Sequence, residues 1–236
     1  MSLYVEIEKQ LGSFHLQVQF ETDREALGLL GISGSGKSVT LKCIAGLLRP
    51  DRGIILLDGK TLFDSKAHID LPPQEREVGY LFQEYALFPN MTVWQNIATG
   101  LRNASSLSVA DCIRRFSLEG LEQHYPHQLS GGQKQRTALA RILINHPRSL
   151  LLDEPFSALD RPLRFRLQQE LQELLQEMHI PAILVTHDMD EVAALCGQAA
   201  ILHNGQLTES GMTAELLQHP KTEAGLLLTG FERRLP

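Results

Sequence analysis

A glycine-rich stretch from Gly31 to Ser38 has the residue types and spacing of a phosphate-binding loop. It reads GISGSGKS and matches the pattern G-x-x-x-x-G-K-[ST]. Glycines at these positions let the backbone turn so that successive N–H groups point at phosphate oxygens, and the positive end of a following helix adds to the attraction. The spacing differs from the G-x-G-x-x-G of dinucleotide-binding folds. The stretch therefore predicts a site for the phosphates of ATP or GTP.

Two side chains of this loop have distinct expected tasks. The Lys37 ammonium would meet the β and γ phosphates, and the Ser38 hydroxyl would bind Mg²⁺. A flexible glycine turn that binds nothing is the alternative, but the apolar run before the loop and the helical pattern after it favour phosphate binding. The loop residues predicted to contact the nucleotide are Gly31, Ser33, Gly34, Ser35, Gly36, Lys37, Ser38 and Val39.

Two adjacent carboxylates end a second apolar run, SLLLDE, at Asp153 and Glu154. A phosphate loop needs a carboxylate at the end of a neighbouring strand to hold the hydrated metal, so we predict Asp153 as a Mg²⁺ ligand. Glu154, at the mouth of such a site, is placed to polarise the attacking water as a general base. The alternative for Glu154 is a solvated acid at the end of a strand.

Two further polar residues follow apolar runs: Gln83 comes after VGYLF and His187 after AILVT. In open α/β sheets the ligand lies beyond the carboxyl ends of the strands, so both side chains are expected to project into one crevice. We predict that both take part in catalysis near the γ-phosphate, and that Gln83 also contacts the metal. A lone histidine at a strand end is more often a cap or a core residue, so this prediction depends on the neighbouring motifs.

A second glycine turn, LSGGQ, precedes a basic helical pattern far downstream of the phosphate loop. Ser130 can cap the helix, while Gly131 and Gly132 let backbone N–H groups approach an anion. The chain offers only one phosphate loop, so the partner of this second turn is not evident from the pattern. A simple helix cap is the alternative.

The apolar pattern predicts a sheet that brings these residues together. Alternating residues over 3–7 and 14–20 indicate two half-buried antiparallel strands, and Asn204-Gly205 suits a hairpin turn. A helix is expected over 38–48, ended by Arg49-Pro50, and another after 161. Buried, mostly parallel strands are expected over 25–31, 78–82, 149–154 and 182–188.

These elements predict an α/β fold of the P-loop NTPase class, with a mostly parallel central sheet, an N-terminal antiparallel β subdomain and an inserted helical subdomain. We expect a single domain over 1–236. Its nucleotide-binding core would comprise 1–83 and 148–236, and the helical subdomain 84–147.

Composition excludes several classes of protein. The net charge of −6 argues against a general nucleic-acid binder. The three cysteines are far apart, with neither a CxxC pair nor metal-ligand spacing, which favours a reducing, cytosolic compartment. The start of the chain lacks the pattern of a signal peptide, and no apolar run approaches the ~20 residues of a membrane span. A membrane role would therefore need a partner.

The motifs GISGSGKS, Gln83, LSGGQ, LLLDEP, SALD and VTH occur here in the order and spacing of ABC-type ATPases, and the chain resembles that family over almost its whole length. The resemblance implies a head-to-tail dimer with two ATPs between the copies. The signature turn, from Ser130 to Gln133, would close over the γ-phosphate held by the other copy. By the same resemblance, Asp160 would link the two sites, His187 would contact the γ-phosphate, and Phe14 would stack on adenine where many relatives have a tyrosine. A core role for Phe14 is the alternative.

The segment LPPQEREVGYLFQEYALFPNMTVWQNI resembles the corresponding region of bacterial importers, in particular the molybdate and sulfate group. This implies a peripheral protein on the cytoplasmic face of the cell membrane, held there by permease subunits that contact Tyr85–Pro89 and act with a solute-binding protein. Molybdate is the first expectation; sulfate, tungstate, a metal or a polyamine are alternatives. A less favoured alternative is an ABC ATPase that acts on nucleic acid, which would carry long coiled coils that this chain lacks.

Overall fold

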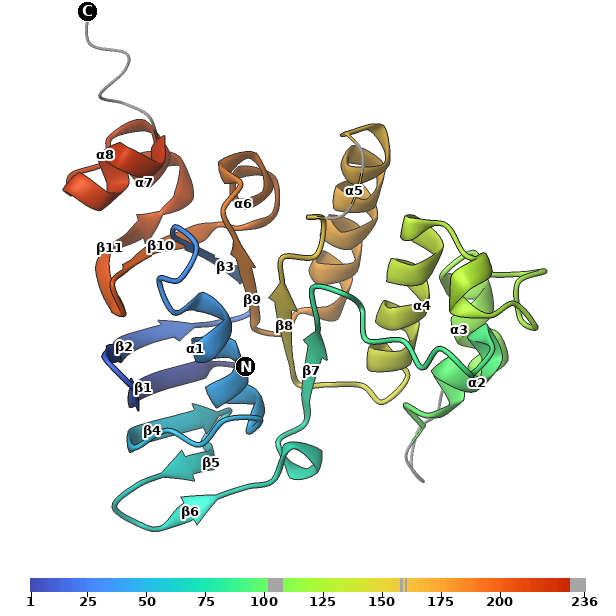
Figure 1. The fold of residues 1–236 in the computed structure, drawn as a ribbon, viewed down its shortest axis with the longest axis horizontal. Helices are drawn as coiled ribbons and strands as arrows, with labels where there is room; N and C mark the ends of the chain where they lie inside the picture. The colour runs from blue at the N-terminus through green and yellow to red at the C-terminus, as the bar shows by residue number, and fades with distance from the viewer. Residues whose placement is uncertain (102–107, 158, 160, 230–236) are drawn as a thin grey trace, which may run out of the picture.

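A single mixed sheet organises the molecule (Figure 1). The computed structural model describes residues 1–101, 108–157, 159 and 161–229. The strands are β1 (Leu3–Leu11), β2 (Phe14–Thr22), β3 (Ala26–Leu30), β4 (Arg52–Leu57), β5 (Lys60–Asp64), β6 (Ile69–Asp70), β7 (Val78–Leu81), β8 (Ser149–Asp153), β9 (Ala182–Thr186), β10 (Gln198–His203) and β11 (Gln206–Met212). The helices are α1 (Lys37–Ala45), α2 (Val93–Ala98), α3 (Val109–Arg115), α4 (Gly131–Leu143), α5 (Arg161–Met178), α6 (Met189–Leu195), α7 (Thr213–Gln218) and α8 (Glu223–Thr229), with 3₁₀ turns at Pro73–Glu75 and Pro126–Gln128.

The antiparallel half of the sheet has the order β6-β5-β4-β1-β2. Alternating residues of β1 and β2, such as Val5 and Leu16, are fully buried, so the predicted alternation is confirmed. This half joins the rest through one parallel pairing, between Gln17 of β2 and Gln206 of β11. The β10–β11 hairpin turns at Asn204-Gly205, both of which have positive φ, as the sequence predicted.

The parallel half has the order β10-β3-β9-β8-β7. Every residue of β3, β8 and β9 is buried, as expected for strands covered on both faces. Helix α1 packs on one face, while α4, α5 and α6 pack on the other. Because β3, β7, β8 and β9 are parallel, their carboxyl ends lie at the same edge of the sheet. This edge positions the loops that follow these strands. The predicted fold class is confirmed.

Helix α1 is shorter than predicted, because it ends at Ala45 rather than near residue 48. Gly46 adopts a left-handed conformation with φ 76°, which stops the helix. The apolar residues that follow keep the helical spacing although the helix has already ended. A prediction from spacing alone therefore placed its end too late.

A buried arginine holds the end of α1. The Arg76 side chain is fully buried, and its guanidinium donates to the carbonyl oxygens of Cys43 and Ile44, each at 2.9 Å. It also donates to the Asp70 carboxylate at 2.8 Å. These bonds bind carbonyl oxygens of the last turn of the helix, and they tie α1 to the segment that leads into β7.

Replacing Arg76 by methionine should lower the free energy of unfolding by about 2–4 kcal/mol, because it removes a buried guanidinium that donates to the carbonyl oxygens of Cys43 and Ile44 and to the Asp70 carboxylate. Chemical denaturation measures the difference. Arg49→Met is the matched control: its guanidinium also faces Asp70, at 3.6 Å, but its side chain is 69% exposed, so we expect a change of less than about 0.5 kcal/mol. Equal losses for the two variants would contradict this role of Arg76.

The segment between Gln83 and Pro147 contains α2, α3, α4 and the second 3₁₀ turn. Each helix begins at a capping box, in which Thr92, Ser108 and Ser130 accept a hydrogen bond from the backbone three residues on. Their apolar faces form a separate core cluster that includes Val93, Ile97 and Ile113. The bounds 84–147 remain a prediction. Among the described residues, none of the helices is both long and apolar enough to cross a bilayer.

Candidate active site

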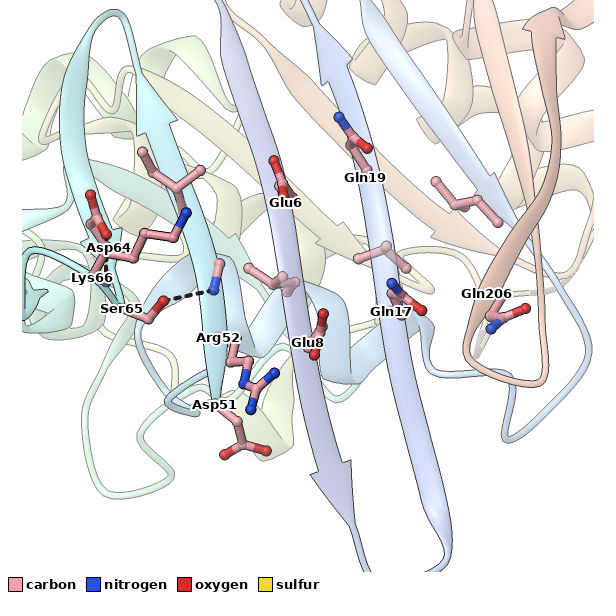
Figure 2. Close-up of a pocket in the computed structure, with 15 residues that line it drawn as sticks. Glu6, Glu8, Gln17, Gln19, Asp51, Arg52, Asp64, Ser65, Lys66 and Gln206 are labelled. Atoms are coloured by element: carbon pink, nitrogen blue, oxygen red, sulfur yellow. Dashed lines mark hydrogen bonds between the residues drawn. The ribbon is translucent and has the colours of Figure 1, made fainter.

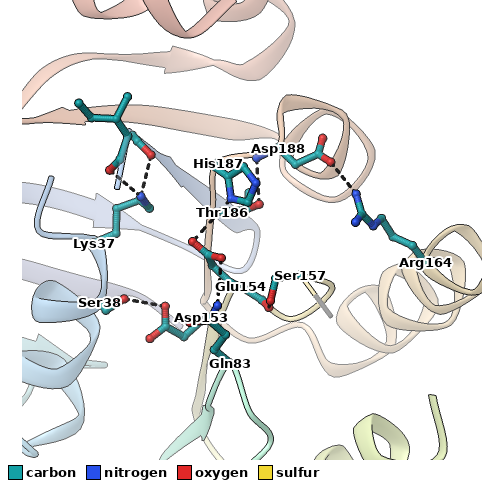
Figure 3. A network of polar contacts seen from close by, with 12 residues as sticks. Lys37, Ser38, Gln83, Asp153, Glu154, Ser157, Arg164, Thr186, His187 and Asp188 are labelled. Atoms are coloured by element: carbon teal, nitrogen blue, oxygen red, sulfur yellow. Dashed lines mark hydrogen bonds and ion pairs between the residues drawn. The ribbon is translucent and has the colours of Figure 1, made fainter. Parts of the chain in front are cut away.

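The phosphate loop connects β3 to α1 and folds around its own lysine. Lys37 Nζ donates to the carbonyl oxygens of Gly31, at 2.6 Å, and Ile32, at 3.0 Å (Figure 3). Gly34 and Gly36 have φ of 81° and 110°, which residues with a side chain rarely adopt. The predicted contacts Ser33 and Gly34 are exposed; the others, Gly31, Ser35, Gly36, Lys37, Ser38 and Val39, are buried or half-buried. Lys37 thus reaches back across the loop to its first two residues.

Both oxygens of Asp153, at the end of β8, have partners. Ser38 Oγ donates to Oδ1 at 2.9 Å, and the Tyr80 hydroxyl donates to Oδ2 at 2.8 Å. Burial, followed by the charge of Asp153, raises the pKa of the Tyr80 hydroxyl. The sequence analysis had assigned both Ser38 and Asp153 to Mg²⁺ but had not singled out Tyr80.

Glu154 lies between the other two predicted catalytic residues (Figure 3). Gln83 Nε2 is 3.4 Å from Glu154 Oε2, and His187 Nδ1 is 3.6 Å from Oε1. Glu154 has φ 45°, uncommon for a residue with a side chain, and its N–H donates to Val185 O at 2.9 Å. Its side chain is 23% exposed. The site therefore brings together Gln83, Glu154 and His187 as the sequence predicted, with the carboxylate open to solvent.

The charges of the site act on one another. Burial lowers the pKa of the Lys37 ammonium, while the negative charges of Glu154 and Asp153 act in the opposite direction. Lys37 is thus a buried cation whose charged form the two nearby carboxylates favour.

The residue after His187 is anchored to α5. Asp188 caps α6 through Oδ1, which accepts from Asp190 N at 2.9 Å, and its Oδ2 accepts from Arg164 at 3.0 Å. Its own N–H donates to Thr186 Oγ1 at 3.0 Å. This fixes the backbone on the carboxyl side of His187, whose ring is 65% exposed.

The signature turn lies away from the phosphate loop. Ser130 Oγ accepts from Gln133 N at 3.3 Å, and Gln133 Oε1 accepts from Ser130 N at 2.8 Å, so these side chains cap their own helix. The Ser130 side chain is exposed, and Gly131 is half-buried. Figure 1 shows α4 and α1 on different sides of β7 and β8. The structure thus brings Gln83, Lys37, Asp153, Glu154 and His187 together but leaves Ser130–Gln133, including Gly132, outside that group.

Phe14 begins β2 beside the phosphate loop. A Cβ built on Gly36 would lie 2.9 Å from Phe14 Cζ, so the ring covers the glycine directly. Phe14 is half-buried and packs against the core cluster on that face. This position is compatible with both predicted roles, stacking on a base and packing in the core. Asp160 lies outside the described residues.

A hollow of about 1120 Å³ lies elsewhere, on the outer face of the antiparallel strands (Figure 2). Polar side chains such as Glu6, Glu8, Gln17 and Gln19 line it. None of the predicted site residues borders it, so its size does not mark the active site.

Comparisons with known proteins agree with this geometry. The family profile described as "ABC transporter" matches residues 15–157. The molybdate/tungstate import ATP-binding protein WtpC of Archaeoglobus fulgidus is 41% identical over 97% of this chain and 95% of that protein. The sulfate/thiosulfate import ATP-binding protein CysA of Thermosynechococcus vestitus is 44% identical over 91% of this chain and 65% of that protein. The molybdenum import ATP-binding protein ModC of Rhizobium johnstonii is 38% identical over 98% of this chain and 67% of that protein.

Two solved structures are also similar. One is a dimer of an ATP-binding cassette in a post-hydrolysis state bound to ADP and Pi, with a TM-score of 0.73 and 28% identity over 90% of this chain and 99% of that one. The other is cbiO1 from Clostridium perfringens, part of the ABC transporter complex cbiONQ, with a TM-score of 0.77 and 29% identity over 92% of this chain and 90% of that one. With the profile covering more than half of its length, this chain belongs to the ABC transporter family.

Proposed function

We propose that this protein hydrolyses ATP to drive a membrane importer, and that the imported solute is an oxyanion, molybdate before tungstate or sulfate. The observation that carries the proposal is the meeting of Lys37, Asp153, Glu154 and His187 at the carboxyl ends of parallel strands. Relatives named for import of molybdate, molybdenum and sulfate support the solute class. A relative named for spermidine and putrescine import keeps polyamines as the alternative.

Mg²⁺ fits the oxygen atoms beside the phosphate loop. It prefers hard oxygen ligands and keeps several waters, so one carboxylate and one hydroxyl suffice. Ser38 Oγ and Asp153 Oδ1 are 2.9 Å apart and face one another, and Gln83 would add its amide oxygen. Among the described residues no group of three or more His, Cys, Asp or Glu side chains could hold a metal, in keeping with a site completed by water and phosphate. When bound, Mg²⁺ would neutralise charge on the phosphates.

In this proposal each residue of the site has a separate task in the reaction. Lys37 holds the terminal phosphates, and the Glu154 carboxylate accepts a proton from the water that attacks the γ-phosphate. Gln83 and His187, on either side of Glu154, orient that water and contact the γ-phosphate. The distances of 3.4 and 3.6 Å suit a site that tightens around its substrate.

The exposed signature turn supports a site shared between two copies. The N-terminus of a helix attracts an anion through its backbone N–H groups. In this chain Ser130 is exposed, Gly131 and Gln133 are half-buried and Gly132 is buried, and the turn lies away from the phosphate loop. We infer that Ser130, Gly131, Gly132 and Gln133 bind the nucleotide of a second copy. A structure similar to this chain was solved as a dimer with ADP and Pi, which supports the arrangement.

The segment Tyr85–Pro89 is the proposed contact with permease subunits. Tyr85 and Ala86 have φ of 61° and 46°, and Arg141 holds their carbonyl oxygens at 3.1 and 2.9 Å. Phe88 is 47% exposed, above the Arg141 guanidinium at 5.3 Å. A rigid backbone that presents an exposed ring suits an apolar partner helix. The protein would thereby sit on the cytoplasmic face of the membrane, together with a permease and a solute-binding protein and without nucleic acid.

Reconstitution with permease subunits tests the function. In proteoliposomes that hold the chain, the permease and its binding protein, we expect molybdate to stimulate ATP hydrolysis and to accumulate inside, with tungstate next and sulfate weaker. Phosphate release and solute uptake are measured together. Stimulation by spermidine instead would replace the oxyanion assignment, and ATP hydrolysis that no permease changes would contradict the importer assignment.

Phe88→Ser should weaken binding to the permease roughly tenfold or more, because it removes an exposed aromatic anchor. ATP hydrolysis by the chain alone should remain unchanged. Phe165→Ser is the matched control, since Phe165 is 63% exposed on α5. Affinity for the permease in detergent measures the effect, and equal behaviour of the two variants would move the docking surface away from Tyr85–Pro89.

A further inference from the structure

Asp153 has a second anchor besides the phosphate loop. Its Oδ2 accepts a hydrogen bond of 2.8 Å from the Tyr80 hydroxyl, while Oδ1 accepts one of 2.9 Å from Ser38. The torsion that rotates a carboxylate about its last bond is soft, so a single bond leaves the plane of the group free to turn. With both oxygens held by donors from different elements, the plane is fixed.

The position of Tyr80 follows from the sheet. β7 and β8 pair in parallel with Tyr80 beside Leu151, so Tyr80 and Asp153 project to the face that α1 covers. The Tyr80 ring also lies 4.4 Å from that of Phe82, between ring centroids. The strand pairing and the packing of its ring therefore hold the hydroxyl in place independently of Asp153.

We propose that Tyr80 is a positioning residue for the metal site, which holds the Asp153 carboxylate so that Oδ1 faces Ser38 and the cation. The inference rests on the proposed function, in which Asp153 and Ser38 hold Mg²⁺. Hydrogen-bond donors behind a ligating group fix its orientation, and their removal typically costs 10–100-fold in metal affinity. A tyrosine hydroxyl shielded from solvent needs a hydrogen-bond acceptor whether or not it supports a metal site. The contact with Asp153 therefore fits both a structural and a positioning role, and the affinity for the cation is the quantity that distinguishes them.

The test compares Tyr80→Phe with the unmodified chain. Mn²⁺ is the probe, because it shares the oxygen-ligand preference of Mg²⁺. It is titrated into a solution in which the full chain is in excess over a non-hydrolysable ATP analogue. Electron paramagnetic resonance measures the concentration of free Mn²⁺. We expect roughly tenfold weaker Mn²⁺ binding. Affinity for the analogue in the presence of a chelator should not change, because the Tyr80 hydroxyl donates to Asp153 and not to the phosphate loop.

Tyr85→Phe is the matched control, since the hydroxyl of this buried tyrosine donates instead to Pro155 O at 3.3 Å. Its Mn²⁺ affinity should equal that of the unmodified chain. A Tyr80→Phe, Asp153→Asn double variant should lose no more affinity than Asp153→Asn alone, because Tyr80 acts through that carboxylate. Melting temperatures identify any variant that loses its fold.

Unchanged Mn²⁺ affinity in Tyr80→Phe, or an equal loss in Tyr85→Phe, would overturn the inference. Additive losses in the double variant would overturn it as well. Absence of nucleotide-dependent Mn²⁺ binding by the unmodified chain would instead contradict the proposed function, so the two failures are distinguishable.

Discussion

Replacing Glu154 by glutamine should lower the rate of ATP hydrolysis about 10²–10⁴-fold while ATP still binds. Glutamine keeps the size of the side chain and its contacts with Gln83 and His187, but its amide does not accept a proton from water. The phosphate loop, with Lys37 and Ser38, is unchanged. ATP should therefore accumulate in the closed dimer, which light scattering detects as a dimer that persists in ATP, alongside measured phosphate release.

Glu84→Gln is the control for this variant. Glu84 is exposed and adjacent in sequence to Gln83, so its replacement removes the same charge near the site without touching the proposed base. It should hydrolyse ATP at the rate of the unmodified chain. Phosphate release by Glu154→Gln at that same rate would refute the role of Glu154 as general base.

The residues of the site were predictable because each follows a short local pattern. Gln83, Asp153, Glu154 and His187 all come directly after apolar runs, and parallel strands bring such positions to one edge of a sheet. Lys37 and Ser38 belong to a pattern that a single stretch of sequence contains. Their contacts, including the bond of 2.9 Å between Ser38 and Asp153, follow once the strands pair.

Tyr80 could not be predicted in the same way. Its contact with Asp153 depends on β7 being the neighbour of β8 and on the register that places Tyr80 beside Leu151. Within VGYLF it looks like another residue of a buried strand. The end of α1 was misplaced for a different reason, because the apolar spacing continues past Gly46, the residue whose left-handed conformation stops the helix.

The local sequence pattern also did not predict that the antiparallel and parallel parts join in one sheet. Both parts were predicted, and the fold class is confirmed, but the pairing of Gln17 with Gln206 joins segments from opposite ends of the chain. Among the described residues, the pairing of β2 with β11 consists of this one residue pair. Alternation within a strand specifies its buried face, but it does not specify which distant strand lies at its edge.

Two variants that are inactive alone should recover ATP hydrolysis when mixed, if each site combines two copies. Lys37→Ala removes the phosphate-loop cation, and we expect it to lower the rate about 10²-fold or more. Ser130→Asp places a carboxylate where the γ-phosphate of the other copy would lie. Aspartate is itself a good helix cap, so this variant keeps the capping role of Ser130 and changes only what the exposed turn offers to a nucleotide.

In a mixed dimer, the loop of the Ser130→Asp copy faces the signature turn of the Lys37→Ala copy, so one site is intact. The other site combines both defects. Phosphate release measured after mixing should therefore exceed that of either variant alone. If the nucleotide were enclosed within one chain, each copy would carry one defect and mixing would restore nothing. Ser108→Asp, at the capping box of α3, is the control and should retain activity on its own; if Ser130 were only a helix cap, Ser130→Asp would behave in the same way.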